Sequence, residues 1–141
     1  SSDLTPFLVM FFAMLVSTGG NTSGQTSAIA IQGMSSGDIN NSNVKKFLKR
    51  EFLIGSMLAF MLSIVCFIRV YFVHQDLLGS CIVSVSLGLI VMLSVALGAS
   101  FPIVLKKLGV DPAFSAGPFL ATLMDILGIC IYCYVAYLVL S

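Results

Sequence analysis

The stretch that decides the fold lies between Asp76 and Lys106. It reads LLGSCIVSVSLGLIVMLSVALGASFPIVL and contains no charged residue. An α-helix rises about 1.5 Å per residue and needs about 20 apolar residues to cross the roughly 30 Å hydrocarbon core of a bilayer. Its apolar residues are too continuous for the two-residue alternation of a transmembrane β-strand. The sequence therefore predicts a membrane-spanning helix over residues 77–105.

Three further charge-poor stretches have the same character, which gives four predicted spans: about 4–34, 47–73, 77–105 and 113–140. We expect an all-α integral membrane protein whose residues 1–141 form one transmembrane domain in the lipid bilayer. Within the third span, small residues recur at spacings that bring membrane helices together. These residues are Ser80, Ser84, Gly88, Ser94 and Gly98.

The composition argues against several classes of protein. Only 9% of the 141 residues are charged, whereas about 25% is usual for a soluble domain. A net charge of +1 provides no basic field that could hold a nucleic acid. The sequence contains no Walker loop, no nucleophile elbow and no acid–base pair in an aqueous cleft, so nothing in it indicates an enzyme.

The basic residues predict the orientation in the membrane. Six of them lie between the first and second spans or between the third and fourth: Lys45, Lys46, Lys49, Arg50, Lys106 and Lys107. By the positive-inside rule, the loops at residues 36–50 and 106–111 face the cytoplasm of a multi-pass cell-membrane protein. Both ends of the chain then face outward. Since the first span lacks a leader that could carry its N-terminus across, we expect an earlier membrane helix in a longer protein.

Asp125 is the most informative residue for function, because it falls near the middle of the fourth span. A carboxylate at that depth costs about 2.5–3.5 kcal/mol on insertion scales and normally marks an ion or proton route. A structural alternative is a protonated Asp125 that bonds to a neighbouring helix. The residues that share its helical face are small or carry oxygen: Ala121, Thr122, Gly128 and Tyr132.

The first span is interrupted by residues 17–27, STGGNTSGQTS, which are all small or polar. Such a segment cannot face lipid and must pack against protein or line a water-filled cavity. Close packing explains its Gly and Ser residues but does not readily explain Asn21 and Gln25, which lie one turn apart. We therefore expect these amides to line a pore. In the fourth span Pro118 follows Gly117 and removes a main-chain hydrogen bond, which predicts a bend that exposes carbonyl oxygens.

A carboxylate among hydroxyls, amides and carbonyls suits hard cations such as Mg²⁺, Mn²⁺ or Ca²⁺. A twofold dimer would bring two copies of Asp125 together, and a cation between them would offset their repulsion. Composition alone does not separate this arrangement from a proton relay in a proton-coupled exporter, or from a structural membrane subunit without transport.

Two long motifs resemble one family. Residues 19–27, GGNTSGQTS, are similar to the GGNTGNQS signature of the MgtE magnesium transporters. GVDPA at residues 109–113 and PFLATLMD at residues 118–125 resemble that family's GVDPA and NPLVATLSD run. The chain departs from the pattern at Gly117, where the family has asparagine, and at Ser23 and Gly24, where it has Gly and Asn.

The resemblance implies a homodimeric Mg²⁺ channel, of which this chain supplies helices two to five of a five-helix membrane domain. Its pore would lie on the dimer axis between the first and fourth spans, with Asp125 as the selectivity-filter carboxylate and Ala121 as the adjoining cation ligand. The expected pore-lining residues are Asn21, Thr22, Gln25, Gly117 and Thr122. Asp111 is expected to cap the fourth span, and a cation site at the cytoplasmic mouth is a second possible role. Mn²⁺, Co²⁺ and Ca²⁺ remain alternative ions, and the family's cytoplasmic regulatory domains are absent from these residues.

Overall fold

The computed structural model describes residues 4–141, apart from the side chains of residues 4 and 114–116. This part of the chain is helical with short connections and has no β-strand. Its helices are α1 (Leu4–Met10), α2 (Phe12–Ser36), α3 (Val44–His74), α4 (Leu77–Lys107) and α5 (Pro112–Leu140). Four segments are long and apolar enough to cross a membrane, with α1 and α2 counted as one. The predicted all-α fold with four spans is confirmed.

The first span differs from the prediction, because it is broken at Phe11 rather than being one helix over residues 4–34. The Phe11 amide donates to the carbonyl of Leu8 at 3.3 Å. The hydroxyl of Tyr132 in α5 donates to the same carbonyl at 2.5 Å. A side chain that inserts into the main-chain ladder is a common cause of a helix kink. The break is therefore a tertiary effect of α5.

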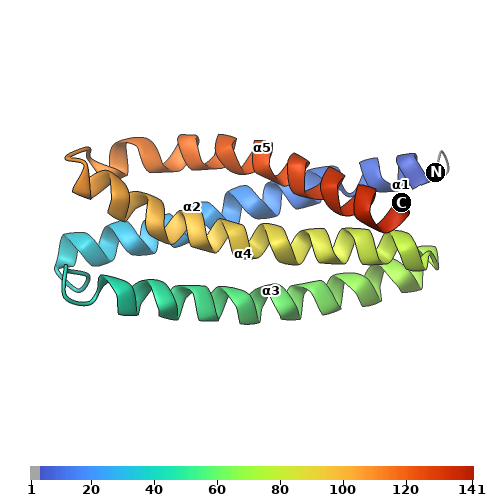
Figure 1. Ribbon diagram of the computed structural model, residues 1–141, viewed down its shortest axis with the longest axis horizontal. Coiled ribbons are helices and arrows are strands. Elements are labelled where there is room, and N and C mark those ends of the chain that lie inside the picture. The colour runs from blue at the N-terminus through green and yellow to red at the C-terminus, as the bar shows by residue number, and fades with distance from the viewer. Residues whose placement is uncertain (1–3) are drawn as a thin grey trace.

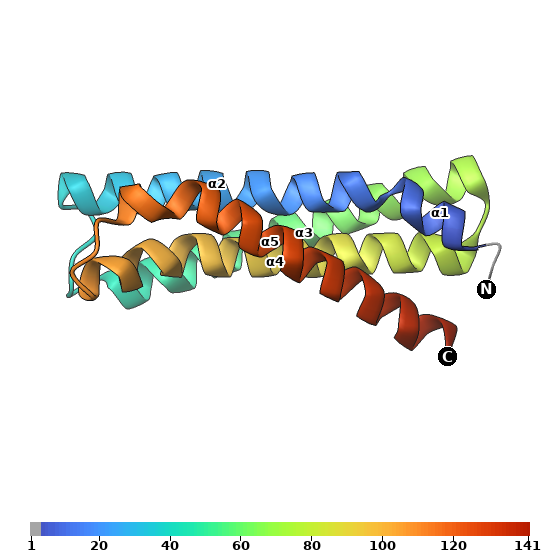
Figure 2. The ribbon, with the colours of Figure 1, turned by 90° about the horizontal axis from the view of Figure 1, so that it is seen from above.

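The helices form an elongated bundle (Figure 1). The connections α2–α3 and α4–α5 lie at one end, with the clustered lysines and Arg50 beside them, and we call this the basic end. Helix α4 is the centre of the bundle, since it contacts each of the other helices. In the described structure α3 packs mainly on α4, and its last residue, His74, also meets the rings of Phe7 and Phe11. Figure 2 shows α5 beside α2 at the basic end and crossing at a slant, so that its C-terminal end lies away from α2.

Small residues set the close helix crossings, as the sequence predicts. At Gly98 an added Cβ would lie 2.6 Å from the carbonyl oxygen of Ser23, so α2 and α4 meet there backbone to backbone. At Gly88 an added Cβ would collide with the Ser63 hydroxyl of α3. That hydroxyl donates to the Ser84 carbonyl at 2.9 Å and links α3 to α4. Only residues without bulk allow these contacts.

The turn from α4 to α5 also follows the prediction. Gly109 has a positive φ of 81°, which a glycine adopts without strain and which ends α4. Asp111 is the N-cap of α5, and its Oδ1 accepts a hydrogen bond from the Ala113 amide at 3.0 Å. Pro112 occupies the first helical position, where a missing amide hydrogen costs nothing. The prediction that Asp111 caps the last span is confirmed.

Candidate functional site

Asp125 lies at the edge of the buried face of α5. Leu120 and Met124 point into the core and are fully buried, and Ala121 and Asp125 follow them by one residue, about 100° further round the helix. Both are half-buried. Thr122 is exposed on the surface of the single chain. Helix geometry thus places Asp125 where it is partly shielded but still reachable from outside the chain.

The Asp125 carboxylate has no hydrogen-bond or ion-pair partner within residues 4–141. Tyr132, which the sequence places on the same face, gives its hydroxyl to the Leu8 carbonyl instead. The expectation that Tyr132 supplies an oxygen near Asp125 is therefore wrong. An unpaired charged group is costly in a membrane span.

The predicted polar residues of α2 lie on the helix face that points away from the core. Gly19, Ser23 and Ala30 are buried against the other helices. Asn21 and Gln25 lie on the opposite side and are exposed. Their side-chain amides make no hydrogen bond with the described residues. We call Asn21, Gln25 and Gln32, which continues the same stripe, the polar face of α2. Thr22 lies beside this face and is half-buried.

The polar face of α2 and Asp125 lie at similar depths in the bundle. An added Cβ on Gly19 would lie 3.5 Å from Cε of Met124, the residue before Asp125. No hydrogen bond joins Asn21, Thr22 or Gln25 to Asp125 in the described structure. Among the residues described, no three His, Cys, Asp or Glu side chains converge as a metal site would require. Within the described part of one chain, the predicted residues therefore do not come together as a single site.

The proline of α5 leaves the helix continuous. Residues 112–140 form one helix through Pro118, and Gly117 beside it is exposed. Since only one main-chain hydrogen bond is lost, the turns on either side hold the helix together. Figure 2 shows the first turns of α5 lying along α2 and the remaining turns slanting away from it, so the helix changes direction without breaking.

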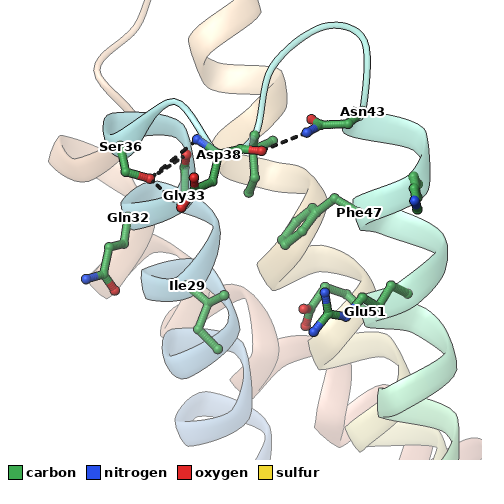
Figure 3. Close-up of a pocket in the computed structure, with 11 residues that line it drawn as sticks. Ile29, Gln32, Gly33, Ser36, Asp38, Asn43, Phe47 and Glu51 are labelled. Atoms are coloured by element: carbon green, nitrogen blue, oxygen red, sulfur yellow. Dashed lines mark hydrogen bonds between the residues drawn. The ribbon is translucent and has the colours of Figure 1, made fainter.

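A cleft of about 600 Å³ lies at the basic end, where the loop from α2 returns to α3 (Figure 3). Gln32 lines it from α2, so the cleft continues from the last residue of the polar face. Lys46, Arg50 and Glu51 line it from α3. Glu51 makes no ion pair with these bases in the described chain. The cleft is a mixed-charge surface rather than an acidic one.

The loop of the cleft is held by Asn43. Its Nδ2 donates to the main-chain carbonyl of Asp38 at 2.7 Å, and its Oδ1 accepts from the Asn40 amide at 2.7 Å. Figure 3 shows this side chain reaching back toward Asp38. Asn43 stands at the N-cap position of α3, but its side chain makes no cap hydrogen bond. Both polar atoms of the Asn43 side chain bond to the loop before α3, so neither is free to cap the helix.

The chain is similar to known proteins over most of its length. The family model MgtE, described as a divalent cation transporter, matches residues 12–135. The chain belongs to the MgtE family. The match begins at the start of α2 and ends five residues before the end of α5. It therefore covers both the polar face of α2 and Asp125. Its membership and its four apolar helices make this chain a multi-pass membrane protein.

Curated members of the MgtE family resemble almost the whole chain. The "Magnesium transporter MgtE" of Thermus thermophilus is 36% identical over 95% of this chain. The proteins of the same name from Bacillus subtilis and Enterococcus faecalis are 36% and 31% identical over 89% and 92% of it. The chain spans 28–30% of the length of these relatives.

Gln32 is the residue that sequence reasoning missed. It lies seven residues after Gln25, two turns along the same helical face, and this spacing is readable in the sequence. The polar segment predicted from sequence ends at residue 27, where apolar residues resume. The structure extends the polar face of this MgtE-family chain to the cleft at the basic end.

Proposed function

We propose that this chain is the ion-conducting membrane part of a magnesium channel and that hydrated Mg²⁺ passes through a pore on the axis of a homodimer. The observation that carries the proposal is Asp125, a half-buried carboxylate in a membrane span without a partner among the described residues. The family's description and the names of the relatives support divalent cations, and magnesium first, as the cargo.

A twofold partner explains both the carboxylate of Asp125, unpartnered in the described chain, and the outward-facing amides of α2. The amides of Asn21 and Gln25 face outward at membrane depth, where lipid offers them no hydrogen bond. In a twofold dimer the same surface of each copy meets its counterpart, so the polar faces of two α2 helices line one wet channel. Thr22, Gly117 and Thr122 belong to the same lining in this proposal.

The chemistry at the axis follows from the ligands. Mg²⁺ gives up water reluctantly and is usually held by one or two carboxylates while it retains several waters. Two Asp125 carboxylates would supply that charge, with the Ala121 carbonyl as a further oxygen. Without a cation between them they would share a proton. Oxygen ligands of this kind also accept Mn²⁺, Co²⁺ or Ca²⁺.

The same proposal sets the orientation. The loops at residues 36–50 and 106–111 face the cytoplasm, which places the cleft and Asp111 at the inner mouth. Asp111 uses one carboxylate oxygen to cap α5 and has a second oxygen that can attract cations there. In a full-length relative, regulatory domains would lie on this side.

The deciding experiment is Mg²⁺ uptake into vesicles by the wild-type chain, Asp125→Asn and Asp125→Glu. Removing the charge from a membrane span favours insertion, so Asp125→Asn should fold and lose uptake. Asp125→Glu keeps the charge and should retain part of the flux. Undiminished flux in Asp125→Asn would refute the assignment of the filter.

The same vesicles separate the competing functions. A channel conducts down a Mg²⁺ gradient with no pH gradient, whereas a proton-coupled exporter that uses Asp125 as its relay requires one. A wild-type chain that shows no flux under either condition would be a structural subunit.

Cross-linking tests the dimer arrangement. In a background without the four native cysteines, Asn21→Cys should form a disulfide between two copies, because it lies on the proposed axis. Phe60→Cys is a matched control, since Phe60 is 69% exposed on α3 but far from that axis. Equal cross-linking at both positions would contradict the arrangement.

A further inference from the structure

A groove of about 630 Å³ lies between α3 and α4 near the basic end, on a different side of α3 from the cleft. This volume is within the range of about 300–1,000 Å³ typical of ligand pockets. Its α3 wall is formed by Leu48, Phe52 and Leu53, and its α4 wall by Ala96 and other small residues. The groove is thus an open hollow between two membrane-spanning helices.

The walls of the groove are chemically apolar, although two serines line it. The Ser56 hydroxyl donates to the Phe52 carbonyl at 2.9 Å, and the Ser100 hydroxyl donates to the Ala96 carbonyl at 2.6 Å. Both polar atoms are therefore satisfied by their own helices. A hydrocarbon chain can lie against this surface without leaving a hydrogen bond unmade.

One cation stands at the rim. Lys49 is the only charged residue that lines the groove, and it makes no ion pair within the described chain. Lys45 lies one turn before it on the same face of α3. Lys46 and Arg50 line the cleft instead, which also holds Asp38 and Glu51. Among the described residues, Lys49 therefore brings a positive charge without an ion-pair partner to the groove.

We infer that the groove binds one anionic phospholipid of the leaflet at the basic end. An acyl chain lies between α3 and α4, and the phosphate lies against the Lys49 ammonium. Charge complementarity favours a headgroup with net negative charge, because basic residues near a membrane surface attract anionic lipids. The inference needs only the membrane-spanning fold and is independent of ion conduction.

Native mass spectrometry of the detergent-solubilised chain, titrated with phosphatidylglycerol or phosphatidylcholine, tests this site. We expect phosphatidylglycerol to be retained preferentially, and Lys49→Gln to weaken its retention roughly fivefold. Lys46→Gln is the matched control, since it removes the same charge from the same helix but on the cleft side, and it should leave retention nearly unchanged. Equal losses in both variants would mean general attraction to the basic end and would overturn the site.

A second pair of variants tests the apolar part. Ala96→Leu fills the groove and should weaken retention of both lipids about tenfold, because each excluded methylene forfeits its burial. Ala13→Leu, at an exposed position near the other end of the bundle, should not. Lipid retention that ignores Ala96→Leu would show that the groove is empty or covered by protein, and either outcome would refute the inference. Asp125→Asn should keep the lipid even if it loses flux.

Discussion

Helices α4 and α2 are both rich in small and hydroxyl-bearing residues, but they use their polar atoms differently. In α4 the hydroxyls of Ser80, Ser94 and Ser100 each donate to a carbonyl of the preceding turn or cap at 2.6 Å. These atoms are satisfied without any neighbour. These three serines therefore serve as small residues that let the surrounding helices come close, whereas the buried Ser86 hydroxyl of the same helix has no partner among the described residues.

The polar face of α2 cannot be satisfied in this way. A side-chain amide has two donor hydrogens and an acceptor oxygen, and those of Asn21 and Gln25 have no partner in the part of the chain that the structure describes. In a membrane such groups need protein or water beside them. The hydroxyls named in α4 are thus compatible with dry packing, whereas the outward amides of α2 require protein or water beside them.

The largest effect on stability should come from the crossing of these two helices. Gly98→Ala places a Cβ 2.6 Å from the Ser23 carbonyl oxygen, and this main-chain atom cannot move without shifting α2. We expect a loss of about 2 kcal/mol in the free energy of unfolding in detergent. Gly20→Ala in α2 is the control, because its added Cβ meets nothing within 4 Å. If both variants unfold alike, the close crossing is not what holds α2 to α4.

The second prediction concerns the polar face. Replacing Asn21 and Gln25 together by Leu should lower Mg²⁺ flux in vesicles at least about tenfold, equivalent to about 1.4 kcal/mol. The unfolding midpoint should not fall, since neither amide makes an internal bond. Ser80→Ala in α4 should leave flux unchanged. Loss of folding in the double variant would show instead that the amides support the chain itself.

The sequence predicts the four spans well, because they depend on the local cost of charge in hydrocarbon. The gap between Asp76 and Lys106 is a span in any arrangement of its neighbours. The carboxylate of Asp125 is likewise costly at that depth whatever packs beside it.

The features that sequence could not give depend on contacts between distant residues. The break at Phe11 depends on the hydroxyl of Tyr132, which lies 124 residues from the carbonyl of Leu8 that it bonds. The position of Asn43 depends on the fold of the loop before α3. Whether Asn21 and Asp125 face one pore depends on a second copy, which no pattern within one chain can place.

The third prediction removes the contact that breaks the first span. Tyr132→Phe deletes the hydrogen bond to the Leu8 carbonyl and should cost about 1 kcal/mol, within the range for polar contacts between membrane helices. The loss is measured by unfolding in detergent. Tyr134→Phe is the matched control, because Tyr134 is 62% exposed and should be neutral. A stable Tyr132→Phe would mean that the kink at Phe11 has a cause within α1 and α2.

The smallest effect separates serines that bond across helices from serines that bond within one. Ser63 of α3 donates to the Ser84 carbonyl of α4, so Ser63→Ala should cost about 0.6 kcal/mol, the average for such contacts in a membrane. Ser94 donates to the Ile90 carbonyl of its own helix, and that carbonyl keeps its main-chain position when the hydroxyl is removed. Ser94→Ala should therefore be nearly neutral in the same unfolding measurement. If Ser94→Ala lowers the free energy of unfolding more than Ser63→Ala does, the Ser94 hydroxyl does more than allow close packing. The contrast between α4 and α2 would then be wrong.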